Sequence, residues 1–149
     1  MDDLVLVDDE LRLRPYVGGA DLEVAASWCS GTRDEVAARY QGLAARGDVY
    51  MVERRTPWGW AVVGDVTLAA DGLPIVIAPD HRRQGLARRV VLRLVDRARV
   101  LGWRELRVQD SVSDDAGRGL FTGVGFRPCP SSPPALALPL SPIGGRTRC

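Results

Sequence analysis

The segment from Leu73 to Val100 constrains the fold more than any other part of the sequence. It begins with a short apolar run, Leu73 to Ile77, and continues through a polar turn that contains Gly85. From Leu86 onward, apolar residues recur at the spacing of an amphipathic helix, which we expect to end near Gly102. A strand that enters a long helix through a glycine turn is typical of domains that combine strands and helices.

Patterns on either side of this segment predict further strands and helices. Thr32 to Glu35 has the composition of a capping box, which marks a helix start, and Asp21 is the expected N-cap of an earlier helix. The remaining expected elements are two short strands or one hairpin over 4–14, helices over 22–31, 33–47 and 115–122, and strands over 49–53, 60–68, 105–108 and 135–140. We therefore predict an α/β (α+β) fold with a mixed central sheet flanked by helices.

Length and charge limit what this chain can be. At 149 residues it has the size of one compact domain, which we place at 1–140, with 141–149 as an expected mobile tail. The formal net charge of +1 gives no overall attraction to nucleic acids or acidic membranes. No apolar stretch approaches the roughly 18 residues that a membrane span needs, and the acidic start is unlike a signal peptide.

The cysteines and the single histidine lack metal-ligand spacing. Cys29, Cys129 and Cys149 are odd in number, which favours reduced thiols and a cytoplasmic location. His81 lies in the polar turn, and nothing in the sequence places it beside a thiol. We expect it to face solvent or a bound phosphate, and we expect no metal site.

The polar turn has the features of an anion site. A helix start exposes about four backbone N–H groups and carries roughly half a positive charge. Gly85 lets the backbone approach an anion closely, and four arginines surround it, at positions 82, 83, 88 and 89. The turn has neither the Gly-x-Gly-x-x-Gly nor the Gly-Lys-Ser/Thr pattern of the common nucleotide loops.

The sequence Arg82-Arg83-Gln84-Gly85-Leu86-Ala87 fits the pattern Arg/Gln-x-x-Gly-x-Gly/Ala. It resembles the acyl-CoA signature of the GNAT superfamily of N-acetyltransferases. Two further stretches are similar to that family: Phe121 to Phe126, at the place of its Tyr-x-x-x-Gly-Phe motif, and "LRLRPYVGGADLEVAASW". The latter looks like the opening of the ribosomal-protein N-terminal acetyltransferase branch and its small-molecule relatives. The resemblance covers roughly residues 11 to 140.

The resemblance implies a site for acetyl-CoA as co-substrate. The pantetheine arm would pair with Ile75 to Ile77, where the family's sheet splays, and the pyrophosphate would bind N–H groups from Arg83 to Arg88. Asp114 stands where the family often has an asparagine that contacts CoA. The implied cofactor-binding residues are Ile75, Val76, Ile77, Arg82, Arg83, Gln84, Gly85, Leu86, Ala87, Arg88, Asp114 and Phe121.

The catalytic residues are less clearly marked. In the family a tyrosine often protonates the leaving thiolate, but the matching residue here is Phe121, which has no proton to give. Gly72 and Gln109 stand where relatives often carry a glutamate base, and neither can act as one. The nearest carboxylates, Asp71 and Asp110, are the candidate bases, although turn positions also suit them.

The resemblance implies an N-acetyltransferase that acts on a primary amine by direct attack in a ternary complex. The acceptor would be a small molecule, which we favour slightly, or a protein N-terminus; Trp58 and Trp60 either pack in the core or line its pocket. A CoA-binding protein with little or no transferase activity is the alternative, because of Phe121 and the missing glutamate. We expect no nucleic-acid or membrane partner, and a homodimer is possible by analogy alone.

Overall fold

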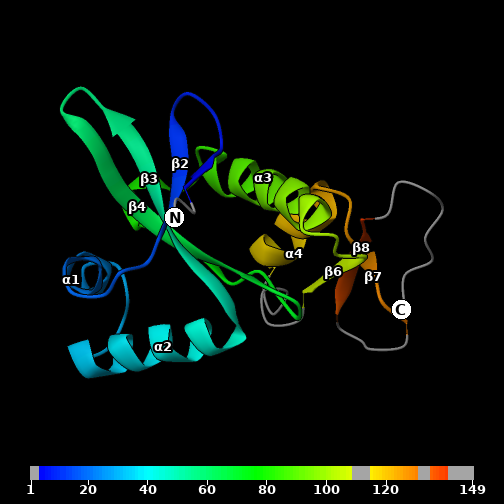
Figure 1. Cartoon of the computed structure of the whole chain (residues 1–149), viewed down its shortest axis with the longest axis horizontal. Helices are drawn as coiled ribbons and strands as arrows, with labels where there is room; N and C mark the ends of the chain where they lie inside the picture. The colour runs from blue at the N-terminus through cyan, green and yellow to red at the C-terminus, as the bar shows by residue number, and fades with distance from the viewer. Residues whose placement is uncertain (1–3, 109–114, 131–134, 141–149) are drawn as a thin grey trace. The chain divides into compact units, whose positions relative to one another are not determined.

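The computed structural model describes residues 4–108, 115–130 and 135–140. The chain forms two compact units. The first consists of Met1–Leu68 and Ile75–Leu86, and the second of Ala69–Pro74 and Ala87–Cys149. Each unit is thus assembled from two stretches of sequence. Figure 1 shows the chain coloured by residue number, with its helices and strands labelled.

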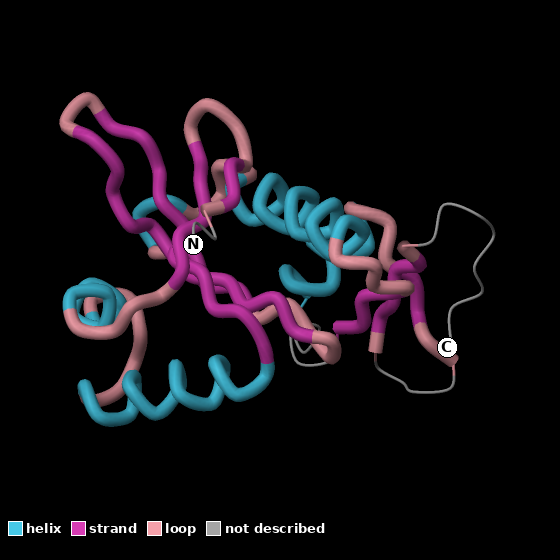
Figure 2. The backbone as a smooth tube through the Cα atoms, in the orientation of Figure 1, coloured by secondary structure: helices cyan, strands magenta, loops and turns pink. Residues whose placement is uncertain are grey.

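The first unit contains a five-stranded sheet in the order β1-β2-β3-β4-β5. Its strands are β1 (Val5–Leu6), β2 (Leu11–Pro15), β3 (Gly47–Thr56), β4 (Gly59–Ala69) and β5 (Ile75–Ile77). The strands β3 and β4 form a long hairpin around a turn at Pro57 and Trp58, as the runs of β-branched and aromatic residues predict (Figure 2). The order of strands in space follows their order in sequence, and the longest connection, residues 16–46 between β2 and β3, contains the two helices of this unit.

Two helices belong to the same unit. Helix α1 (Ala20–Ala26) packs on α2 (Arg33–Arg46), and α2 packs on β3. The Thr32 hydroxyl accepts a hydrogen bond from the Glu35 N–H at 3.2 Å, so Thr32 is the N-cap of α2 and the predicted helix start is confirmed. Their interface buries a cluster that contains Ala25, Val36, Tyr40, Leu43 and Val49.

The second unit contains two helices and a smaller sheet. The helices are α3 (Leu86–Val100), whose first residue belongs to the first unit, and α4 (Asp115–Gly123). The sheet has the order β6-β8-β7, from β6 (Glu105–Val108), β8 (Leu136–Pro139) and β7 (Arg127–Pro128), with antiparallel pairings. Along α3 the predicted apolar row is buried, since Leu86, Val90, Leu94 and Ala98 are at most 2% exposed.

The α/β class and most elements are confirmed, and several details differ. The described strands form two sheets rather than one mixed sheet, and β7 is a strand that was not among the predicted elements. Gly19, not Asp21, occupies the N-cap of α1. The expectation of three reduced thiols is wrong for Cys129, which is buried and disulfide-bonded.

The predicted domain boundary at residue 140 stays a prediction, because the segment 141–149 lies outside the described residues. Among the helices of the described residues, none combines the length and the apolar character that a membrane crossing requires.

Candidate functional site

Strand β5, which contains the predicted pantetheine-binding residues, lies at one edge of the five-stranded sheet. It pairs with β4 in antiparallel register, with Ile77 opposite Gly64 and Val76 opposite Asp65. The Ala78 N–H donates to the Val63 carbonyl at 2.7 Å. Because hydrogen bonding alternates along an antiparallel strand, the backbone groups of Ile75 and Ile77 point away from β4, toward the open edge.

Gly64 lets β4 and β5 approach closely. A Cβ atom at this position would collide with the Val76 carbonyl oxygen and would lie 3.1 Å from Ile77 Cα. Glycine is therefore required here by contact, although its φ is not in the left-handed region. The close packing of β4 against β5 at Gly64 therefore fixes the position of the β5 backbone, including the groups that point toward its open edge.

The chain leaves β5 through a short 3-10 helix, Pro79–His81, and enters the glycine loop, which we define as residues 82–85. The Arg82 side chain turns back toward the strand, and its Nε donates to the Ile77 carbonyl at 2.8 Å. The Arg82 N–H donates to the Pro79 carbonyl at 3.3 Å. The Nε of Arg82 thus binds the loop to β5, so this side chain is not a purely solvated charge.

The backbone of the glycine loop has two residues in the left-handed region. Gly85 has φ 76°, and Arg83 has φ 63°, the one positive value among non-glycine residues that the structure describes. A Cβ built on Gly85 meets no protein atom within 4 Å, so the space beside this residue is open. Successive N–H groups in such turn conformations form concavities that suit anions.

The first turn of α3 follows directly along the chain. Leu86 is 2% exposed, so its side chain belongs to the core and only its N–H group could serve a ligand. Ala87 is half-buried, and Arg88 is exposed. Within the second unit, Arg88 Nη1 lies 3.9 Å from the position that a Cβ at Gly123 would take.

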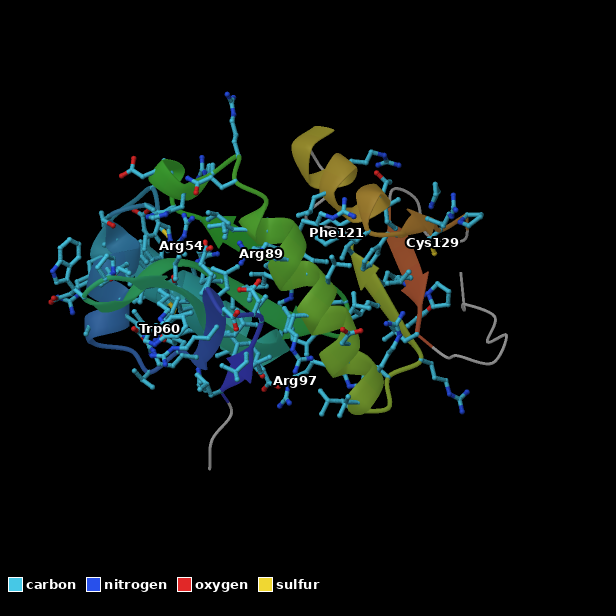
Figure 3. All side chains as sticks on the ribbon, turned by 90° about the horizontal axis from the view of Figure 1, so that it is seen from above. Arg54, Trp60, Arg89, Arg97, Phe121 and Cys129 are labelled. Atoms are coloured by element: carbon cyan, nitrogen blue, oxygen red, sulfur yellow. The ribbon has the colours of Figure 1, made fainter. Side chains whose placement is uncertain are left out.

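The other predicted site residues are distributed more widely. Phe121, which is labelled in Figure 3, has no exposed area. Its ring packs edge-on against Phe126 with centroids 5.2 Å apart. Asp71 is exposed in the turn that joins Ala69 to Gly72. Asp110 and Asp114 lie outside the described residues.

The two tryptophans that we considered for an acceptor pocket behave differently from each other. Trp58 is 93% exposed at the tip of the β3–β4 hairpin and packs in no core. Trp60 is half-buried, and the Arg12 guanidinium lies over its ring at 4.2 Å from the centroid. That geometry is a cation–π contact, which accounts for Trp60 without an acceptor.

The sequence analysis missed a buried charged cluster in the first unit. Asp65 on β4 is fully buried and accepts hydrogen bonds from Arg39, at 3.0 and 3.3 Å, and from the Tyr40 hydroxyl at 2.7 Å. Burial and the negative charge of Asp65 raise the pKa of Tyr40 far above its usual value, so this hydroxyl stays protonated. The signal that could have revealed the cluster is a lone aspartate inside the apolar strand sequence "AVVGDVTLA".

A second set of charges lies around Glu53, which is 6% exposed. Arg12 and Arg14 contact its two carboxylate oxygens at 2.7 and 3.3 Å, and Arg14 also pairs with Asp21 at 2.7 Å. Burial raises the pKa of Asp21, but hydrogen bonds from Arg14 and the Val17 N–H outweigh it and lower that pKa overall. Asp21 therefore ties α1 to β2, which explains why it does not cap the helix.

No group of three or more histidine, cysteine, aspartate or glutamate side chains that could hold a metal ion occurs in the described part of the chain.

A comparison with the sequences of curated proteins found no match. A comparison with solved structures found acetyltransferases that share this fold at low sequence identity. One is an acetyl transferase from Salmonella typhimurium that modifies the N-terminal serine of 50S ribosomal subunit protein L7/L12. It has a TM-score of 0.74 and 11% identity, over 93% of this chain and 100% of that chain.

Two further structures contain ligands. Spermidine N-acetyltransferase from Vibrio cholerae, in complex with CoA and spermine, has a TM-score of 0.65 and 19% identity, over 82% of this chain and 83% of that chain. A GNAT family acetyltransferase from Elizabethkingia anophelis with acetyl-CoA bound has a TM-score of 0.62 and 15% identity. The match covers 89% of this chain and 100% of that chain.

At these identities the structural matches establish the fold alone. The family itself follows from the sequence profile described as Acetyltransferase (GNAT) family, which matches residues 28–126. This range includes β5, the glycine loop and all of α3, together with the Phe121 to Phe126 stretch. Because the match spans more than half of the chain, the protein belongs to the GNAT acetyltransferase family.

Proposed function

We propose that this protein is an N-acetyltransferase that moves an acetyl group from acetyl-CoA to a primary amine. The observation that carries the proposal is the run from β5 through the glycine loop. An edge strand with outward backbone groups is followed by two left-handed residues, Arg83 and Gly85, beside open space. Family membership and the ligand-bound relatives agree with this assignment.

The residues present fit acetyl-CoA in two ways. The amide groups of pantetheine can extend the sheet by pairing with Ile75 and Ile77, as peptides do at open sheet edges. The pyrophosphate suits the N–H groups that follow one another from Arg83 to Arg88, because a helix start and a turn of this kind favour anions. In this proposal Gly85 contributes by leaving space, and the arginine side chains contribute by long-range attraction.

The reaction is the attack of a neutral amine on the thioester carbonyl. A C–N bond forms, the C–S bond breaks, the amine loses a proton and the thiolate of CoA gains one. Because acceptor and donor are held together, proximity supplies a large part of the rate acceleration. Asp71 and Asp110 stay the candidate bases, directly or through water.

The leaving thiolate lacks an obvious proton donor. Phe121 has no hydroxyl, and its ring is buried against Phe126. A thiol with a pKa of about 8.5 is a good enough leaving group to depart with help from solvent alone. We therefore include no tyrosine acid in the mechanism.

The acceptor is a small-molecule amine or a protein N-terminus. Relatives of the same fold include one enzyme of each kind, which modify the N-terminal serine of L7/L12 and spermidine. Both classes contain a primary amine, which must be in its neutral form when it attacks the thioester carbonyl. The choice between them depends on residues outside the acetyl-CoA site.

The test combines binding and turnover. Calorimetry with CoA measures binding, and CoA release from acetyl-CoA is followed with polyamines, amino acids and short peptides that have free or blocked N-termini. We expect CoA binding and turnover with free amines only, with the acetylated product identified by mass spectrometry. An absence of CoA binding would contradict the proposal.

The buried Phe121 favours a second candidate, a CoA-binding protein of the same fold with little or no transferase activity. It predicts the same calorimetric signal with no release of CoA above the rate without protein, for every amine in the panel. That outcome would reject the enzyme and keep the cofactor site.

A further inference from the structure

Arg54, which is labelled in Figure 3, contacts two other segments of the first unit that are far from it in sequence. Its Nη1 donates to Gln84 Oε1 in the glycine loop at 2.7 Å and lies 3.4 Å from His81 Nδ1. Its Nε donates to Glu10 Oε1 at 2.8 Å. One guanidinium on β3 therefore links the β1–β2 turn to the loop that follows β5.

The Glu10 end of this link is itself fixed. The Arg55 N–H donates to the Glu10 carbonyl at 2.8 Å, and the Glu10 N–H donates to Asp8 Oδ1 at 2.8 Å. Glu10 is thus held to β3 by backbone as well as by its side chain. The backbone of Arg54 is held in β3, and its Nε is held by Glu10, so the guanidinium is already in place to contact Gln84.

The glycine loop needs such support because part of its backbone is strained. Arg83 has φ 63°, a conformation that costs a side-chain-bearing residue free energy and persists only where its surroundings enforce it. The contact of Arg82 with Ile77 fixes the residue before Arg83, and the contact of Arg54 with Gln84 fixes the residue after it. Gln84 has one further bond, a long one of 3.4 Å from Nε2 to the Asp80 carbonyl.

The geometry suits arginine and excludes lysine. Arg54 uses Nε for Glu10 and Nη1 for Gln84 at the same time, which needs several donors in one rigid plane. A lysine ammonium is a single point and cannot occupy both positions. The ion pair with Glu10 also offsets the charge of Arg54, so its effect on an anion acts through the loop.

We infer that Arg54 is a positioning residue that holds the glycine loop, through Gln84, in the conformation that binds the pyrophosphate of acetyl-CoA. The identity of the ligand, acetyl-CoA, rests on the proposed function. The support of the loop by Arg54 does not, because it concerns the protein without ligand.

The test compares Arg54→Met with Arg55→Met, a matched control, because Arg55 is exposed and its bond to Glu10 is made by the backbone N–H, which the substitution keeps. In the ligand-free protein, NMR order parameters of the N–H groups of residues 82–85 should fall in Arg54→Met alone. The Kd for CoA and the KM for acetyl-CoA should rise about tenfold with kcat unchanged, the signature of lost binding rather than lost chemistry. Arg54→Lys should not restore them.

The outcomes separate the two proposals. If wild-type protein fails to bind CoA, the proposed function is refuted, whereas the order parameters still report whether Arg54 holds the loop. If CoA binds but Arg54→Met leaves either the loop order or the affinity unchanged, the inference on Arg54 is overturned.

A double variant tests whether Arg54 acts through Gln84. The double variant Arg54→Met/Gln84→Ala should lose about as much CoA affinity as Arg54→Met alone, because both substitutions remove the same contact. Fully additive losses would show that Arg54 contacts the ligand by itself and would overturn the inference.

Discussion

Gly85→Ala separates the contribution of Gly85 to the ligand site from its contribution to the fold. Gly85 has φ 76°, and a Cβ added there meets no protein atom within 4 Å. The substitution therefore introduces no internal clash, and its stability cost is that of a left-handed alanine, about 1–2 kcal/mol. For a chain of this size, 1 kcal/mol lowers the Tm by roughly 2–4 °C.

Gly102→Ala is a matched control at the other end of α3. Gly102 has φ 83°, and a Cβ there also meets nothing within 4 Å. It ends the helix, since the Trp103 N–H donates to the Ala98 carbonyl at 3.0 Å across it. Thermal unfolding should therefore give similar decreases in Tm for the two variants.

CoA affinity should distinguish them. In the proposed site the methyl group of Gly85→Ala occupies the space where a phosphate oxygen meets the loop. Loss of one hydrogen bond to a charged group costs about 1.5–3 kcal/mol, which is roughly a tenfold to hundredfold rise in Kd. Calorimetry should show this rise for Gly85→Ala and no change for Gly102→Ala. Equal affinities in the two variants would refute the assignment of the pyrophosphate to this loop.

Further variants test the charged and buried groups. The folded-state pKa of Asp21 is lowered, so its pairing stabilises the protein above the unfolded pKa of about 3.9 and is lost as the pH falls further. The free energy of unfolding, measured with urea, should therefore decrease less between about pH 6 and about pH 3 in Asp21→Asn than in wild type, because the variant has no carboxylate at this position to protonate in this range. Tyr40→Phe removes the buried hydroxyl that donates to Asp65 and should cost about 1–3 kcal/mol, whereas Tyr16→Phe, in the same stacked ring pair, should cost clearly less; equal costs would contradict the importance of that bond. Phe121→Tyr buries a new hydroxyl at a position without exposed area and should lower stability by about 1–3 kcal/mol without raising kcat, while an increase in kcat would show that this ring edge faces the thiolate.

Helix α3 illustrates what local sequence can predict. Its apolar row from Leu86 to Ala98 has the period of a helix, and the structure buries that row as expected. The N-cap at Thr32 was equally predictable, because its side chain bonds to the N–H of Glu35, only three residues away. The resemblance of the glycine loop to the acyl-CoA signature also rests on six consecutive residues, and the family match includes them.

Asp21 shows where local reasoning fails. An aspartate at a helix start is a common N-cap, but its carboxylate here pairs with Arg14 on β2 and with the Val17 N–H. The choice between cap and ion pair depends on how α1 packs against the sheet. Sequence patterns do not contain that information, because the competing partner belongs to another element.

The sequence by itself determined the order of most elements, the strand, loop and helix of the candidate acetyl-CoA site, and the glycine that the loop requires. These features depend on neighbours within a few residues, so a local pattern can specify them. Only the tertiary structure decided that Asp65 is satisfied by Arg39 and Tyr40, 26 and 25 residues away, and that Arg54 supports Gln84, 30 residues away. Such contacts form when packing brings distant segments together, and a buried charge or a strained loop is stable only after that has happened.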